Sequence, residues 1–425
     1  MPQQRWLRII PVALIMYTIS YIDRTNIALA LDPKISTMMR DLALDDSMKS
    51  TVAGIFFWGY LALQIPAGHL ANRWSAKKVI AILLAFWGVC AIGCGLVKTY
   101  EQLVVMRVLL GVAESGVFPA TLVLLANWFP RTERARANAY WNLCQPLAVA
   151  GSAPITGWLI GGWGWKTMLI LEGILPFIWL PLWFYFIDDH PQQAKWISDQ
   201  ERAELESLLQ RETADLESEK TISIWQAFVQ PAIFVMVPIY FLQNCAAYGC
   251  NTFLTDGLRS AGHEFTAFET GVLFAIPYAL AVVIMVLTSR HSDKTHERRG
   301  HVAAVYTMSG VSLIVSVLLK EHSFWLSYLF LCFAIPGPFA GLAPFWAIPA
   351  ETMPRPVLGA VMGLVNAFGN IGGFFGNKMV GFLKTETHGI TVPFSVLGAA
   401  LLLGAALCFL LPRAKKPVPA PQVGC

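Results

Sequence analysis

Four charged residues stand inside long apolar stretches of this 425-residue chain. Asp23 and Arg24 lie in the run YIDRTN, and Arg107 and Glu114 lie in the run RVLLGVAESG. At the centre of a membrane-spanning helix each charge costs about 2.5–3.5 kcal/mol. Carboxylates held there can take up and release protons, and arginines can hold an anion. Structural ion pairs that lock helices together are the alternative explanation.

Amide side chains interrupt two further apolar stretches, at Gln145 and Asn366. A buried amide needs hydrogen-bond partners, because leaving it unpaired in an apolar setting is costly. A hydroxylated anion would supply such partners, and bonds between helices are the alternative. Asn370 follows Asn366 by about one helical turn and faces the same way, so one of the two is expected to be structural.

The composition indicates which elements position these residues. Hydrophobic residues make up 56% of the chain and charged residues 14%, with a mean hydropathy of +0.54. Soluble domains carry about 25% charged residues, so this pattern excludes a water-soluble enzyme and a disordered chain. Stretches of about 20 apolar residues predict membrane-spanning helices. Twelve such spans are expected, at 8–31, 50–71, 79–97, 102–127, 135–160, 168–188, 228–249, 268–289, 301–319, 324–348, 357–382 and 391–411.

One long polar segment, residues 189–227, divides the spans six and six. The sequence therefore predicts an all-α membrane protein with two six-helix bundles, at 1–188 and 228–425, joined by a cytoplasmic linker and ending in a short cytoplasmic tail. If both termini are cytoplasmic, the inside segments carry 20 Lys and Arg against 8 outside, as the positive-inside rule requires. Similar loops recur six spans apart, which indicates an internal duplication typical of transporters with a midplane site.

Other classes of chemistry lack their residue patterns in this sequence. No Ser/His/Asp arrangement, no pair of histidines at ligand spacing and no phosphate-binding loop is found. The eight cysteines are interpreted as apolar filler, and the net charge of +4 is not gathered into a basic face that nucleic acid would need. We therefore expect no enzyme activity, no metal, no cofactor and no nucleic-acid partner.

The loop GHLANRWSAKK at 68–78 resembles the cytoplasmic loop motif of the major facilitator superfamily. That family usually has aspartate where this chain has Asn72, so no ion pair is possible at that position, although the second copy of the loop keeps Asp293. The resemblance implies a cytoplasmic gating motif made of Gly68, Asn72, Arg73, Lys77, Lys78 and Asp293. We expect Arg73, Lys77, Lys78 and Asp293 to brace the outward-open state.

The patterns around Asp23 and Glu114 resemble the anion:cation symporter family within that superfamily, over residues 8–411. The resemblance implies that Asp23 and Glu114 couple transport to protons, that Arg24 meets the substrate carboxylate, and that Arg107 is tied to Glu114. It also implies a substrate site that includes Tyr60, Gln145, Asn366, Tyr248 and Asn251.

These inferences predict a monomeric secondary transporter in the bacterial inner membrane, with both termini cytoplasmic. It is expected to import an organic anion, either a sugar acid or a small hydroxycarboxylate, by proton symport with alternating access. An aromatic acid such as hydroxyphenylacetate or phthalate is the alternative substrate, and exchange or export is the alternative direction. Glu172 and Lys378 are expected near the outer surface as interfacial residues, with an external gate as the alternative.

Overall fold

The computed structural model describes residues 4–218, 230–259, 265–352 and 355–412. In its first half the helices are α1 (Gln4–Thr25), α2 (Ile27–Ala30), α3 (Met38–Asp41), α4 (Asp46–Tyr60), α5 (Gln64–Arg73), α6 (Ala76–Leu96), α7 (Tyr100–Ser115), α8 (Val117–Trp128), α9 (Arg131–Asn142) and α10 (Cys144–Phe186). The 3-10 turn η1 (Pro191–Gln193) and α11 (Asp199–Ser218) follow. The second half holds α13 (Pro231–Arg259), α14 (Ala267–Thr295), α15 (Arg299–Leu319), α16 (Phe324–Ala334), α17 (Pro336–Ala340), α18 (Leu342–Thr352), α19 (Arg355–Thr387) and α20 (Thr391–Cys408).

The described elements confirm the predicted all-α membrane fold. Ten helical segments among them are long and apolar enough to cross a membrane. The segment 136–186 folds back at Gly164 and so crosses twice, and the 33-residue α19 is a further long helix, which agrees with twelve crossings. The predicted boundary at 227/228 and the tail beyond residue 412 lie outside the described residues.

Several expected spans differ in detail from single straight helices. The span 8–31 breaks at Asn26, the span 102–127 breaks at Gly116, and the span 324–348 is three helices around Pro336. At Gly116 a Cβ atom would lie 2.4 Å from the Cβ of Ala67, so only glycine allows α5 to approach the break so closely. Conversely, α10 consists of two helical arms that meet at Gly164, where a non-helical backbone with φ of 79° reverses the chain direction.

The helices of each half pack through glycines that let backbones touch. A Cβ atom on Gly59 of α4 would lie 2.1 Å from the carbonyl oxygen of Val108, and one on Gly111 of α7 would lie 2.1 Å from that of Phe56. In the second half, Gly372 of α19 makes the same kind of approach, 2.3 Å from the carbonyl oxygen of Phe241. Small residues at helix crossings permit such packing in membranes, and here they hold α4 against α7.

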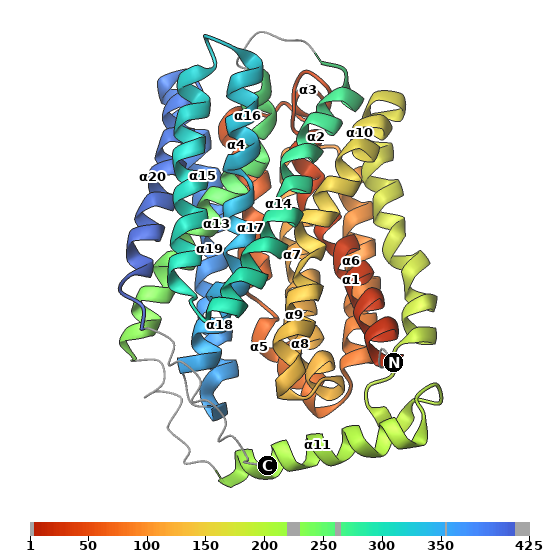
Figure 1. Cartoon of the computed structure of the whole chain (residues 1–425). Helices are drawn as coiled ribbons and strands as arrows, with labels where there is room; N and C mark the ends of the chain where they lie inside the picture. The colour runs from red at the N-terminus through yellow and green to blue at the C-terminus, as the bar shows by residue number, and fades with distance from the viewer. Residues whose placement is uncertain (1–3, 219–229, 260–264, 353–354, 413–425) are drawn as a thin grey trace.

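The terminal face is the one where α1 begins and which α11 crosses, and the opposite face carries α3, the turn at Gly164 and residues 320–323 (Figure 1). The linker helix α11 is fastened to the first half at the terminal face. Arg5 pairs with Glu133 at 2.9 Å and approaches Glu201 of α11 at 4.0 Å, and the ring of Trp196 stacks on Trp128.

Candidate functional site

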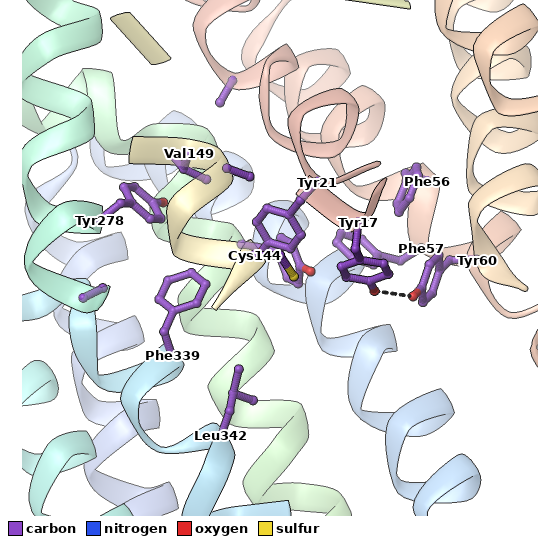
Figure 2. Packing of buried hydrophobic residues seen from close by; sticks show 14 of the residues in the cluster. Tyr17, Tyr21, Phe56, Phe57, Tyr60, Cys144, Val149, Tyr278, Phe339 and Leu342 are labelled. Atoms are coloured by element: carbon purple, nitrogen blue, oxygen red, sulfur yellow. Dashed lines mark hydrogen bonds between the residues drawn. The ribbon is translucent and has the colours of Figure 1, made fainter. Parts of the chain in front are cut away.

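The two halves enclose a cavity midway between the faces. Its volume is about 20 Å³, which is room for roughly one water molecule. Helices α1, α4, α8 and α10 line it from the first half, and α13, α17, α18 and α19 from the second. The lining residues are Tyr17, Tyr21, Arg24, Tyr60, Phe118, Gln145, Tyr240, Gln243, Asn244, Ala247, Tyr248, Phe339, Leu342, Asn366 and Asn370. Figure 2 shows four rings of this lining, those of Tyr17, Tyr21, Tyr60 and Phe339, and the contact between the hydroxyls of Tyr17 and Tyr60, which lie 3.4 Å apart.

An ion pair stands at the wall of this cavity. The Nη2 atom of Arg24 donates to Oε2 of Glu114 at 3.0 Å, and the Ser20 hydroxyl donates to the same oxygen at 2.9 Å. The side chain of Glu114 is fully buried, and that of Arg24 is 4% exposed. Among the described residues, Nε of Arg24 and Oε1 of Glu114 have no hydrogen-bond partner. Each group of the pair therefore keeps one atom that could bind a further partner.

Aromatic rings surround the guanidinium group of Arg24. Its carbon Cζ lies 4.6 Å from the ring centroid of Tyr60, 5.1 Å from that of Phe56 and 5.4 Å from that of Tyr21. Cation–π attraction of this kind stabilises a buried cation, by about 2 kcal/mol or more for each desolvated contact. The arginine can thus remain charged in the cavity wall when its carboxylate partner is removed.

Asp23 lies next to Arg24 in sequence but points to a different neighbour. The indole Nε1 of Trp87 donates to Oδ2 of Asp23 at 3.0 Å, and the carboxylate is buried. Arg107 donates to the backbone oxygen of Asp23 and to that of Val52, each at 3.3 Å. Among the described residues no hydrogen bond joins Arg107 to Glu114, although the two side chains interact as opposite charges.

The predicted amides lie where the two halves meet. Asn366 of α19 donates to Oε1 of Gln64 at 3.0 Å, a bond between the halves, and accepts from Asn370 at 3.0 Å. Gln145 lines the cavity and donates to Asn142 at 3.2 Å. Asn370 also donates to the backbone oxygen of Asn366 within α19, so of these bonds only the one from Asn366 to Gln64 joins the two halves.

The two candidate residues on α13, Tyr248 and Asn251, differ in whether they line the cavity. Tyr248 lines the cavity, and its ring packs edge-on against Phe57 of the first half at 4.4 Å. Asn251 does not line the cavity, because its Nδ2 atom donates to the hydroxyl of Tyr278 at 2.8 Å, within the second half. Residue spacing alone could not separate them, since the two lie about one helical turn apart.

Sequence reasoning missed five polar lining residues, namely Tyr17, Tyr21, Tyr240, Gln243 and Asn244. Gln243 is 3% exposed and donates to the backbone oxygen of Pro338 at 3.0 Å, and its Oε1 atom has no partner among the described residues. The argument applied to Gln145 and Asn366, that an amide in an apolar span needs a partner, would have found Gln243 and Asn244 as well.

Near the opposite face, salt bridges join the two halves. Lys49 of α4 donates to Oδ2 of Asp256 on α13 at 2.8 Å. Lys384 of α19 lies 3.0 Å from both Asp256 and Asp46. We call Asp46, Lys49, Asp256 and Lys384 the ionic latch. Beside it, Lys378 of α19 donates to Thr51 of α4 at 2.5 Å, a further bond between the halves.

Glu172 differs from the interfacial position expected for it. It is 5% exposed and accepts hydrogen bonds from Asn26 at 2.8 Å and from Thr156 at 2.5 Å. The sequence could not reveal this burial, because the turn at Gly164 folds α10 so that Thr156 and Glu172 meet.

The residues of each loop motif form their hydrogen bonds and salt bridges within their own half of the structure. Ser75 caps α6 by accepting from the Lys78 backbone and donates to Asp189 at 2.5 Å. Lys77 binds Asp189 through its backbone nitrogen and approaches Asp188 at 3.6 Å. In the second loop Asp293 pairs with Arg298 at 2.5 Å. Gly68 lets α5 approach Pro119 of α8, where a Cβ atom would lie 3.1 Å away, and Asn72 and Arg73 are exposed.

Comparison with known proteins decides the family. The family model described as Major Facilitator Superfamily matches residues 13–377. The chain belongs to the Major Facilitator Superfamily. It is a multi-pass membrane transporter and not an enzyme.

Curated members of the superfamily resemble the chain along nearly its whole length. A protein of Agrobacterium vitis named for tartrate transport is 29% identical over 412 residues, which is 96% of this chain and 90% of the relative. A protein of Escherichia coli K12 named for galactarate and D-glucarate transport is 24% identical over 420 residues, 95% of this chain and 93% of the relative. A quinolone resistance transporter of Acinetobacter baumannii is 26% identical over 418 residues, 95% of this chain and 93% of the relative.

A solved structure has the same fold. The crystal structure of a bacterial homologue of the human lysosomal transporter Spinster superposes with a TM-score of 0.76 at 15% identity. The match covers 97% of this chain and 99% of that one.

Proposed function

We propose that this superfamily member imports a small organic anion together with protons. The observation that carries the proposal is the Arg24–Glu114 pair, buried at the wall of a cavity between the two halves. An arginine in that place suits a carboxylate substrate. The relatives named for tartrate, galactarate and D-glucarate, all hydroxylated dicarboxylates, support the same substrate class.

Proton coupling follows from competition for Arg24. While Glu114 is ionised it occupies Nη2 of the guanidinium group. A proton on Glu114 removes its charge, so Arg24 becomes available to the substrate carboxylate, together with the Nε atom that already lacks a partner. Asp23, held by Trp87, is the second proton-carrying group in this proposal. The protonated carboxyls and the bound anion then leave the site with no excess buried charge, which favours movement between conformations.

Hydroxyl groups of the substrate would meet the amides. Gln243 offers an unpaired acceptor oxygen, and Gln145 and Asn366 line the same cavity from the other sides. Since an unpaired buried amide is costly, a site of this kind favours hydroxylated acids over acids that lack hydroxyls. A sugar acid or a small hydroxycarboxylate is therefore the proposed substrate. The tyrosine rings around Arg24 favour an aromatic acid as the second candidate.

Alternating access is proposed to proceed by rocking of the two halves. The ionic latch would hold the opposite face closed in one state, and its separation would open the cavity there. The distribution of Lys and Arg supports a cytoplasmic terminal face, so the opposite face would be external. We propose the inner membrane of a bacterium as the location and a monomer as the working unit.

The proposal is tested by uptake into proteoliposomes. Labelled tartrate, galactarate, glucarate and hydroxyphenylacetate are offered with the outside more acidic than the lumen. Wild type is compared with Asp23→Asn and Arg24→Ala. Uptake of an acid that follows the pH gradient and is lost in both variants supports proton symport at this site. Accumulation that both variants leave unchanged would refute it.

A further inference from the structure

We propose that Glu172 is a third proton-carrying carboxylate, which takes the proton from the opposite face and passes it toward Asp23. This inference rests on the proposed function, since it adds a station to the proton route of a symporter. It is carried by the hydrogen-bonded cluster of Glu172, Asn26 and Thr156, which the substrate cavity does not include.

The cluster is buried and lacks a cation. Glu172 is 5% exposed, Asn26 4% and Thr156 1%. In the part of the chain that the structure describes, no Lys or Arg side chain forms a salt bridge with Glu172. A structural ion pair therefore does not explain why an acid is found here. A buried carboxylate without a cation is expensive as an anion, so the site suits a group that carries a proton for part of a cycle.

The two hydrogen bonds can persist when the proton arrives. Thr156 Oγ1 and Oε1 of Glu172 are 2.5 Å apart, and a hydroxyl can donate to a carboxylate or accept from a carboxylic acid. Asn26 Nδ2 donates to the other oxygen, Oε2, at 2.8 Å in either state. The cluster thus holds the charged and the neutral form of Glu172 in the same place, which a transfer station requires.

The cluster lies between the opposite face and Asp23. Chain direction establishes this order, because α1 runs from the terminal face and Asn26 follows Asp23 by about one helical turn. Oδ1 of Asn26 has no partner among the described residues, so it can accept a hydrogen bond from water that brings a proton. Asp23 and Glu172 interact as like charges, so ionisation of both at once is disfavoured.

The other titratable groups on the helices around Glu172 are less suited to pass a proton toward Asp23. Gly173 packs against Ala91 of α6, and the titratable residues in that part of the helix are the buried thiols Cys90 and Cys94, while Lys77 and Lys78 lie at its other end. From α14, which packs on the first arm of α10, Glu269 is exposed and bonded to Thr266. Arg24 of α1 is engaged by Glu114. Asp23, whose charge interacts with that of Glu172, is the acceptor in the proposed route.

The transfer is balanced in protons. A hydronium ion at the opposite face gives one proton to the Glu172 carboxylate and becomes water. The same proton then moves to the carboxylate of Asp23, and Glu172 returns to its anionic form. No other bond is made or broken, and the amide of Asn26 keeps its own hydrogens throughout.

The test compares Glu172→Gln with wild type in proteoliposomes, using glucarate and tartrate as probes. Two assays are run: uptake driven by a pH gradient, and counterflow, which is exchange of labelled for unlabelled acid at equal pH. Glu321→Gln is the matched control, since Glu321 is an exposed acid between α15 and α16. For Glu172→Gln we expect gradient-driven uptake to fall at least about tenfold, while counterflow stays within about twofold of wild type. Glu172→Asp should restore part of the uptake.

Gradient-driven uptake by Glu172→Gln equal to wild type, with the same dependence on external pH, would overturn the inference. If Glu172→Gln loses counterflow as well, Thr156→Val decides: uptake reduced with counterflow retained supports the station, and unchanged uptake overturns it. Wild type that shows counterflow but no response to the pH gradient would refute proton symport itself, and that failure is seen without any variant.

Discussion

Removal of Asp256 from the ionic latch should open the opposite face. In Asp256→Asn, Lys49 loses the carboxylate that its ammonium group contacts at 2.8 Å. The side chain of Lys49 is fully buried, and its ammonium group otherwise lies 4.6 Å from the ring of Phe253. Lys384 is less affected, because it keeps Asp46 at 3.0 Å.

The size of the effect follows from the buried charge. Breaking one side of a buried pair costs about 3–5 kcal/mol, because the other charge remains without compensation. Lys49 regains water when the halves separate at this face, so the penalty falls on the closed conformation alone. Each 1.4 kcal/mol corresponds to about a tenfold change in an equilibrium constant. The ratio of open to closed molecules should therefore rise by roughly a hundredfold to a few thousandfold.

Distances between spin labels on the two halves measure this shift. Ser47 on α4 and Glu386 on α19 are exposed at the opposite face, so cysteines there can carry the labels. Cys425 is replaced by serine first, since the other seven cysteines are buried. Pulsed electron paramagnetic resonance should report a longer distance as the main population in Asp256→Asn and a shorter one in wild type.

A second substitution separates charge from packing. Lys49→Met in the Asp256→Asn background removes the uncompensated cation, so the short distance should return. Glu321→Gln, an exposed acid outside the latch, should leave the distribution unchanged. An Asp256→Asn distribution identical to that of wild type would refute the reasoning, because the latch would then contribute nothing to closure.

Three further predictions concern separate parts of the fold. Gly111→Ala should lower the free energy of unfolding by about 1–3 kcal/mol, because its Cβ would lie 2.1 Å from the Phe56 oxygen; thermal unfolding of Gly162→Ala, which has open space, is the control. Arg24→Lys should weaken substrate binding at least about tenfold by loss of bidentate geometry, measured by equilibrium binding. Burial acts to raise the pKa of Glu297, but bonds from Gly300 and His301 outweigh it and lower that pKa. The ionised Glu297 therefore stabilises the folded protein near neutral pH, and this contribution is lost as the pH falls through the lowered pKa. Glu297→Gln should unfold more easily than wild type at pH 7 and equally at pH 3.

Hydrophobic segments allowed the fold to be predicted well. About 20 apolar residues are needed to cross a membrane, and few other structures require them, so the crossings and the division at the polar linker follow from composition. The breaks at Asn26 and Gly116 could not be predicted, because they depend on helices packed against them. The turn at Gly164 falls between two predicted spans, at the one described glycine with positive φ.

The site could be predicted in its residue types but not in its pairings. Arg24 and Glu114 belong to different helices, and the seven-residue spacing of Arg107 and Glu114 indicates only a shared face. Which arginine reaches the carboxylate is decided by tertiary packing, and here it is Arg24. For the same reason the hydrogen bond between Ser75 and Asp189 could not be predicted, since 114 residues separate the two in the sequence.

Proton uptake on substrate binding tests the central claim most directly, namely that a proton on Glu114 releases Arg24 for the anion. Isothermal titration of the detergent-solubilised protein with glucarate or tartrate is repeated in buffers of different ionisation enthalpy, which gives the number of protons bound with each anion. The account predicts that wild type takes up about one proton more with each anion than Glu114→Gln does, with affinity in wild type rising as pH falls. Binding to wild type with no proton uptake and no pH dependence would contradict the account.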